Sequence, residues 1–183
     1  MRRLLLLAVT ASALCAADPL ADSAQKKLDS ISDRKLKPGA VVTLSPREIN
    51  AWIHEKAVKA FPEGIRNERI ELGPGTADGT ALVDLTKLGK SNSVNPLIAR
   101  LIEGERPLRV AIRVESSNGR CTVFLTHVEL SGVAVDGSIL DFLIRHFVQP
   151  RYPDIKINEP FDLDFNIDRI EIQPAGVRVV IKK

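Results

Sequence analysis

Apolar and polar residues follow two different periods along this chain. Over residues 45–64, SPREINAWIHEKAVKAFPEG, the apolar side chains recur at the 3.6-residue spacing of an amphipathic helix. Ser45 is a good N-cap and Pro46 suits the first helical position, while Glu48 stands where a capping box needs its second acceptor. A Pro-Glu-Gly sequence then ends the pattern. We therefore predict a principal helix over about residues 45–62.

Most of the remaining apolar residues recur at every second position, which is typical of strands with one dry face. Within residues 120–135 the apolar phase slips by one residue between Leu125 and Val128. This slip predicts a β-bulge near Thr126 or His127. The same alternation predicts strands near residues 40–44, 70–72, 81–85, 108–114, 161–167, 170–172 and 177–181.

Two further segments return to the helical period and predict shorter helices at about residues 94–103 and 137–149. Strands that alternate so regularly favour antiparallel pairing, because the strands of a doubly wound parallel sheet are buried on both faces. We therefore expect an α+β domain in which a long curved antiparallel sheet wraps around the principal helix.

The first 17 residues have the order that is typical of a secretory signal peptide, with two arginines, a short apolar run and then small residues. The apolar run is shorter than the roughly 20 residues that cross a bilayer. We expect an exported protein, periplasmic or extracellular. Lipid anchoring at Cys15 is less favoured, because Leu14 is large where a lipoprotein signal needs a small residue. No later apolar stretch is long enough for a transmembrane helix, so we expect the exported chain not to be an integral membrane protein.

After the signal peptide (1–17), residues 18–38 are polar and weakly periodic, and we expect a tether or a loosely docked segment there. Residues 39–183 have the length of a single domain. The chain carries 26 basic and 23 acidic residues, and two of the arginines belong to the signal peptide. The remaining near balance gives no overall field that favours nucleic acid. Cys121 is the one cysteine outside the signal peptide, so an internal disulfide is excluded.

No group of side chains has the spacing of a catalytic or metal site. His54, His127 and His146 lie on three separate predicted elements, and none has a second ligand at helical spacing. Cys121 occupies an apolar strand position, where an inert buried thiol is the usual state. The three glycines of GPGTADG (73–79) precede another strand rather than a helix, so they predict a hairpin turn and not a phosphate site. We therefore expect neither an enzyme nor a cofactor.

The stretch FDLDFNID, residues 161–168, has an acidic or amide residue at every second position, which raises the question of calcium. An EF-hand loop that began at Asp162 would need glycine at its sixth position and glutamate at its twelfth. Those positions hold Ile167 and Gln173. The pattern instead indicates a strand with a solvated acidic face and an inward face of Phe161, Leu163 and Phe165.

The order of several segments resembles exported LmeA-like proteins of the tubular lipid-binding (TULIP-like) kind. The matching features are a strand and a Ser-Pro cap that open the principal helix, Glu48 and Asn50 near its start, and a strand ending in Leu-Ser-Gly before the helix at 137–148. The resemblance covers roughly residues 40–183. It rests on the segments LSPREINAWI, VELSGVAVDGSILDFLI, YPDIKINEPFDLDF and IDRIEIQPAGVRVVI.

The resemblance implies a curved sheet around a helix, with a phospholipid, an acyl chain or another apolar ligand between them, peripheral contact with a membrane and no cofactor. A filled core gives the same apolar stripes, so an envelope protein–protein interaction module without a ligand is the alternative. The expected ligand-lining residues are Trp52, Ile53 and Phe61 on the principal helix, Leu140, Leu143 and Phe147 on the helix at 137–149, and Val110, Ile112, Val123, Leu125, Phe161, Leu163 and Phe165 on strands.

Overall fold

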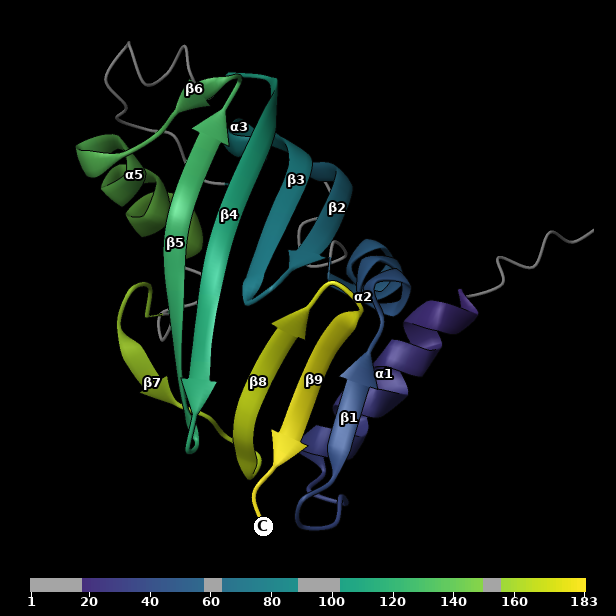
Figure 1. Ribbon diagram of the computed structural model, residues 1–183. Coiled ribbons are helices and arrows are strands. Elements are labelled where there is room, and N and C mark those ends of the chain that lie inside the picture. Colours follow the sequence, from purple (N-terminus) through teal and green to yellow (C-terminus); the bar gives the residue numbers. More distant parts are fainter. Residues whose placement is uncertain (1–17, 58–63, 89–102, 150–155) are drawn as a thin grey trace, which may run out of the picture.

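The fold is α+β, as predicted, and its strands form two antiparallel sheets (Figure 1). The computed structural model describes residues 18–57, 64–88, 103–149 and 156–183. The predicted signal peptide and nearly all of the helix predicted at 94–103 lie outside these residues. The larger sheet has the order β2-β3-β4-β5-β6, with β7 also paired to β5, and the smaller has the order β1-β9-β8. The strands are β1 (Val41–Leu44), β2 (Ile65–Gly73), β3 (Thr76–Asp84), β4 (Glu105–Ser117), β5 (Arg120–Leu130), β6 (Val133–Ala134), β7 (Pro160–Asp162), β8 (Ile167–Gln173) and β9 (Gly176–Ile181).

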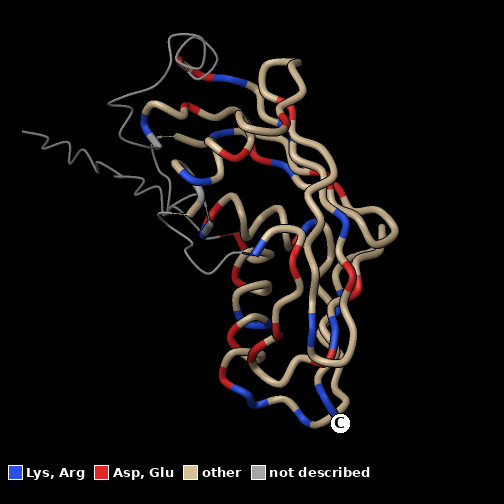
Figure 2. The backbone as a smooth tube through the Cα atoms, turned by 90° about the vertical axis from the view of Figure 1, so that its left-hand side faces the viewer, with Lys and Arg blue, Asp and Glu red and all other residues tan. Residues whose placement is uncertain are grey.

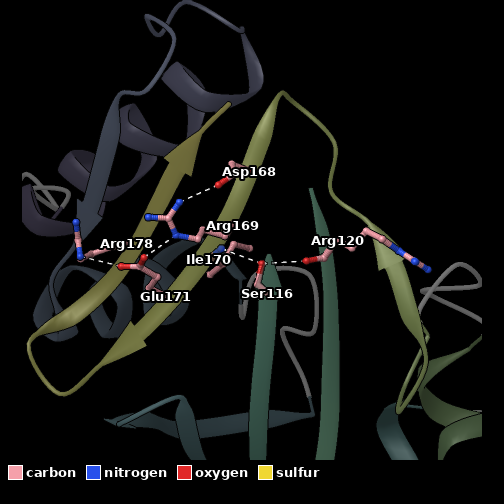
Figure 3. Close-up of polar contacts among 7 residues, drawn as sticks. All are labelled: Ser116, Arg120, Asp168, Arg169, Ile170, Glu171 and Arg178. Atoms are coloured by element: carbon pink, nitrogen blue, oxygen red, sulfur yellow. Dashed lines mark hydrogen bonds and ion pairs between the residues drawn. The ribbon is translucent and has the colours of Figure 1, made fainter. Parts of the chain in front are cut away.

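Backbone hydrogen bonds join the two sheets along β8. The Gly75 N–H donates to the carbonyl of Ile172 at 2.9 Å, and the Gly75 carbonyl accepts from Val114 at 2.8 Å. Gly75 has φ +67°, a left-handed conformation that favours glycine in the two-residue turn between β2 and β3. Further along, the Ser116 hydroxyl accepts from the N–H of Ile170 at 3.0 Å (Figure 3). These contacts make one continuous curved wall from the two sheets.

The β-bulge predicted from the phase slip in β5 is confirmed. Ala111 on β4 pairs with His127, and the next residue, Ile112, pairs with Leu125. Thr126 is therefore the extra residue, and its hydroxyl donates to the Ala111 carbonyl at 2.9 Å. The bulge bends β5 while it keeps the apolar residues before and after it on the same face.

The helices α1 (Pro19–Ser32), α2 (Pro46–Trp52) and α5 (Gly137–Leu143) lie on one face of the wall (Figure 2). The capping box that opens α2 is present, as predicted. The principal helix continues as a π-helical turn, η1 (Ile53–Ala57), and residues 58–63 lie outside the described part. The helix predicted at 137–149 is confirmed as α5 followed by a π-helical turn, η3 (Ile144–Val148). A short helix, α3 (Leu85–Leu88), follows β3.

The prediction of a polar tether at residues 18–38 is wrong. Most of this segment forms α1, which Asp18 caps by accepting a hydrogen bond from the N–H of Leu20 at 2.8 Å. Ala21, Ala24 and Ile31 are buried against the rest of the domain. The buried face consists mainly of alanines, and for that reason the sequence lacks the large apolar stripe that signals a docked helix.

Two separate apolar cores hold the helices on the wall. The first lies under α5, where Leu143 packs with Val83 and with Val128 and Leu130 of β5. The second lies under α1, where Ile31 packs with Val179 of β9 and with β8. Leu130 is 0% exposed and is the one large apolar side chain among the described residues with essentially no exposure.

The strand predicted over residues 161–167 is wrong in its second half. β7 ends at Asp162, and the chain turns before β8 begins at Ile167. Phe165 and Asn166 adopt left-handed conformations with φ of 55° and 58°. Phe165 is 42% exposed, so the inward orientation expected for it is also wrong.

Candidate functional site

The apolar face of the larger sheet, on the side of the helices, is the candidate site. Two rows of directly paired residues cross it from β2 to β5: Ile70, Gly79, Val110 and Val128 form one row, and Leu72, Ala77, Ile112 and Leu125 form the next. The inward residues of these strands, from the margin of the first core toward the second, are called the inner wall; Ala81, Val110 and Leu125 among them pack against the first core. The residues of the inner wall are Ile70, Leu72, Ala77, Gly79, Ala81, Val110, Ile112, Val114, Val123 and Leu125.

Small residues form the floor of the inner wall. The inward positions of β3 hold Ala77, Gly79 and Ala81, while β2 and β4 present larger branched side chains on either side. At Gly79 an added Cβ would meet nothing closer than the Val110 carbonyl at 3.8 Å, which is an ordinary contact. The inward side chains of β3 are therefore shorter than those of the strands on either side, and at Gly79 a side chain could begin without a close contact.

Burial varies along the inner wall: Ala77 on β3 is buried, whereas several branched residues of β4 and β5 are not. Val128 and Leu130 are buried at the end covered by α5, and Cys121 is buried near the opposite end of β5. Between them, Val123 and Leu125 are only half-buried, as are Ile112 and Val114 opposite them. Branched apolar residues in the middle of a sheet are usually buried, so this half-buried stretch is the candidate contact surface for an apolar molecule.

The other face of the same strands is charged and polar. Arg109 pairs with Asp78 at 2.8 Å. Arg113 forms an ion pair with Glu115 and lies over the ring of Phe124, with its guanidinium carbon 4.2 Å from the ring centroid. The two faces of the sheet therefore differ sharply, and the apolar face is the side turned toward the helices.

The start of α2 is fixed to the free edge of β2 by one side chain. The Asn50 amide nitrogen donates to the Ile70 carbonyl at 2.9 Å, and the Ile70 N–H donates to the Asn50 amide oxygen at 2.7 Å. Beside this contact lies an open pocket of about 650 Å³, and its charged lining residues are Arg47, Glu68, Arg69 and Glu71. The pocket thus places polar groups at the edge of the inner wall.

Glu48 joins α1 to α2. Its carboxylate accepts hydrogen bonds from Lys27 at 2.6 Å, from Ser23 at 2.7 Å and from the Ser45 hydroxyl at 2.9 Å. Burial alone would raise the pKa of Glu48, but these donors and the Ser45 N–H outweigh it and lower the pKa to about 2. Lys27 also donates to the Thr43 carbonyl at 2.8 Å, which ties α1 to the strand before α2.

The principal helix meets α1 and the sheet edge rather than the middle of the wall. Trp52 is one of the expected ligand-lining residues, but its indole N–H donates to Gln25 of α1 at 2.7 Å. Ile53 is half-buried in η1. Phe61 lies outside the described residues, and so does the side chain of Phe147.

The remaining predicted residues fall into three groups. Val110, Ile112, Val123 and Leu125 lie together on the inner wall, and Phe161 is half-buried beside them because it pairs with Cys121. Leu140 and Leu143 belong to the first core, while Leu163 packs against the second. Sequence reasoning placed Ile70 and Leu72 on a strand but not among the lining residues. It missed Ala77 and Gly79 because it assigned residues 73–79 to a turn, whereas β3 begins at Thr76.

The polar groups around the site show no catalytic arrangement in the described part of the chain. Burial raises the pKa of the Cys121 thiol, which lowers its reactivity. Across residues 18–57, 64–88, 103–149 and 156–183, no group of three His, Cys, Asp or Glu side chains is placed to hold a metal ion. His54 contacts Glu68 at 2.5 Å on the surface, away from the inner wall.

Comparison of the chain with models of protein families, with curated proteins and with solved structures finds no match. The resemblance to LmeA-like proteins therefore stays a prediction from the sequence. Among the described helices, none has the length and apolar character needed to cross a membrane.

Proposed function

We propose that this protein is exported and binds an apolar ligand, a phospholipid or another molecule with an acyl chain, without catalysing a reaction on it. The observation that carries the proposal is the half-buried inner wall with its floor of small residues. Ala77 and Gly79 stand between branched neighbours on β2 and β4, and the polar face of the sheet lies behind them.

The physical chemistry of such a wall suits an acyl chain. Each methylene group removed from water contributes about 0.8 kcal/mol, and a chain needs no polar partner along its length. A headgroup does need polar partners, and the pocket beside Ile70 offers Arg47 together with Arg69, which is paired with Glu71 at 3.1 Å. Net affinity would be much smaller than the sum over methylenes, because ordering the ligand opposes binding.

Native mass spectrometry of protein purified under mild conditions tests the proposal. We expect an additional mass that organic extraction removes and that has the fragmentation pattern of a lipid. Protein that carries no lipid and binds no fluorescent fatty acid would refute the proposal. The same result, together with one protein cross-linked to it in cells, would favour the interaction module.

A further inference from the structure

Four segments that are distant in the sequence meet at the end of the molecule opposite α5. The Gly39 N–H donates to the Lys182 carbonyl at 3.1 Å, and the Lys182 N–H donates to the Asn166 carbonyl at 2.8 Å. On the same side, the Leu163 N–H donates to the Gly119 carbonyl at 2.7 Å. The loop after α1, the β4–β5 turn, the turn before β8 and the end of β9 therefore share one surface.

This surface carries a concentration of positive charge, seen as Lys and Arg at the lower end of the tube in Figure 2. The opposing carboxylates include Asp33, which pairs with Lys35 at 2.6 Å, Asp164 in the turn before β8, and Asp168, which pairs with Arg169 at 2.8 Å beside Lys182. We use the name basic end for the five exposed cations of this surface together with Phe165. These cations are Arg34, Lys35, Lys37, Lys182 and Lys183.

Phe165 is exposed in the turn that contacts the end of β9 at Lys182. Its left-handed backbone is an unusual conformation for a bulky residue, and the fold maintains it with a 42% exposed aromatic side chain. The turn is held on both sides, since the Ile167 N–H donates to Asp164 and the Lys182 N–H donates to Asn166. The ring is thus presented to solvent by an ordered turn.

A hollow of about 440 Å³ adjoins the basic end. Lys182 and Lys183 line it together with Arg169, and Val41, which is 46% exposed, lies on its apolar side. An anionic group at the mouth of this hollow would meet the two lysines, while apolar groups would meet valine.

We propose that the basic end docks this protein on an anionic lipid bilayer. The lysines and Arg34 would face the headgroups while Phe165 enters the interface between headgroups and acyl chains. A bilayer fits these features better than an acidic protein or a nucleic acid, because an exposed aromatic side chain on the same surface as exposed long-chain cations matches the change from charged to apolar across the interface. The docking surface is separate from the inner wall, so the inference holds whether or not the wall binds a ligand.

Cosedimentation with vesicles tests the proposal. We expect binding to vesicles of equal parts phosphatidylcholine and phosphatidylglycerol, weak binding to pure phosphatidylcholine, and release at high salt, where exposed charges are screened. Each cation near an anionic surface contributes roughly fivefold to partitioning, so Lys37→Gln combined with Lys183→Gln should weaken binding by about 25-fold. The matched control is Lys26→Gln with Arg145→Gln, which removes the same charge at exposed positions outside the basic end and should leave binding nearly unchanged.

Phe165→Asn separates the role of the ring from that of the fold. Asparagine tolerates the left-handed conformation better than phenylalanine, so the variant should fold at least as stably and still bind vesicles less well. Equal loss of binding in the control pair and in the basic-end pair would overturn the proposal. So would tight binding of the wild type to heparin without binding to the anionic vesicles, since that would indicate a polyanion other than a bilayer.

Discussion

The side-chain amide of Asn50 pairs with both backbone groups of Ile70, as a neighbouring strand would do. The two hydrogen bonds, at 2.9 and 2.7 Å, satisfy the backbone groups of Ile70 at the free edge of β2. Another strand therefore cannot pair with β2 at this position. They also fix where α2 meets the sheet, because the same Asn50 nitrogen contacts the Pro46 carbonyl at the first turn of the helix. One side chain thus sets the edge of the inner wall.

Asn50→Ala should therefore destabilise the protein by about 1–3 kcal/mol, because it leaves two partly buried backbone groups of β2 without partners. Urea unfolding followed by circular dichroism measures the change. Asn50→Asp is the matched control: it keeps the acceptor for the Ile70 N–H and should fall between the wild type and Asn50→Ala. An unfolding midpoint for Asn50→Ala equal to that of the wild type would show that water replaces the amide without cost.

Glu48 should make the docking of α1 sensitive to acid. Its pKa is about 2 in the folded protein against an ordinary value of 4.5, so its stabilising effect is complete above about pH 4.5 and is lost as the pH falls toward 2. Glu48→Gln removes the charge that Lys27 and Ser23 bind. We expect the variant to be less stable than the wild type at pH 6 and the gap to narrow toward pH 2.5 in urea titrations. A gap that stays constant over this range would contradict the account.

Trp52 should report whether α1 is docked. It is the single tryptophan of the chain, and its indole N–H bonds to Gln25 of α1. Ala24 is almost fully buried, so Ala24→Glu should release α1 and shift the Trp52 emission to longer wavelength while the strand signal in circular dichroism persists. Lys26→Glu changes an exposed residue of the same helix and should leave the emission unchanged. Emission that is the same in both variants would argue against this contact.

The bulge in β5 should make Thr126 dispensable for folding. Its deletion leaves Leu125 and Val128 on the apolar face, because a regular strand then replaces the bulge. Deletion of Phe124 instead turns Leu125 to the polar face and Thr126 to the apolar face, which should cost about 2 kcal/mol or more from the exposed leucine alone. Thermal unfolding of the two deletion variants gives the comparison. A Phe124 deletion that is as stable as the Thr126 deletion would contradict the register.

Sequence patterns predicted those features that depend on neighbouring residues. The capping box of Ser45 and Glu48 and the bulge at Thr126 were both predictable, because each follows from the spacing of a few residues in one element. The α+β class followed in the same way from regular alternation with few helical segments.

Features that depend on distant contacts were not predictable from the same patterns. The helix α1 is held by buried alanines and by Lys27 reaching Glu48, and neither gives a strong periodic signal. Trp52 matches an apolar stripe, yet its N–H finds a partner on α1 instead of leaving the ring on the sheet. Phe165 continues the alternation of a strand although the chain turns there, because the turn is fixed by hydrogen bonds to residues 119 and 182.

The central claim is that the inner wall is a binding surface, and substitution of its floor tests this most directly. Gly79→Leu adds a large apolar side chain to the inward face of β3, where leucine suits a strand better than glycine and the nearest atom leaves room for its Cβ. Thr80→Leu adds a side chain of the same kind to the opposite, exposed position. We predict that Gly79→Leu raises the dissociation constant for a fluorescent fatty acid by about tenfold or more while the fold stays intact. Thr80→Leu should leave the dissociation constant unchanged. Equal affinity in all three proteins, or no binding by the wild type, would contradict the claim.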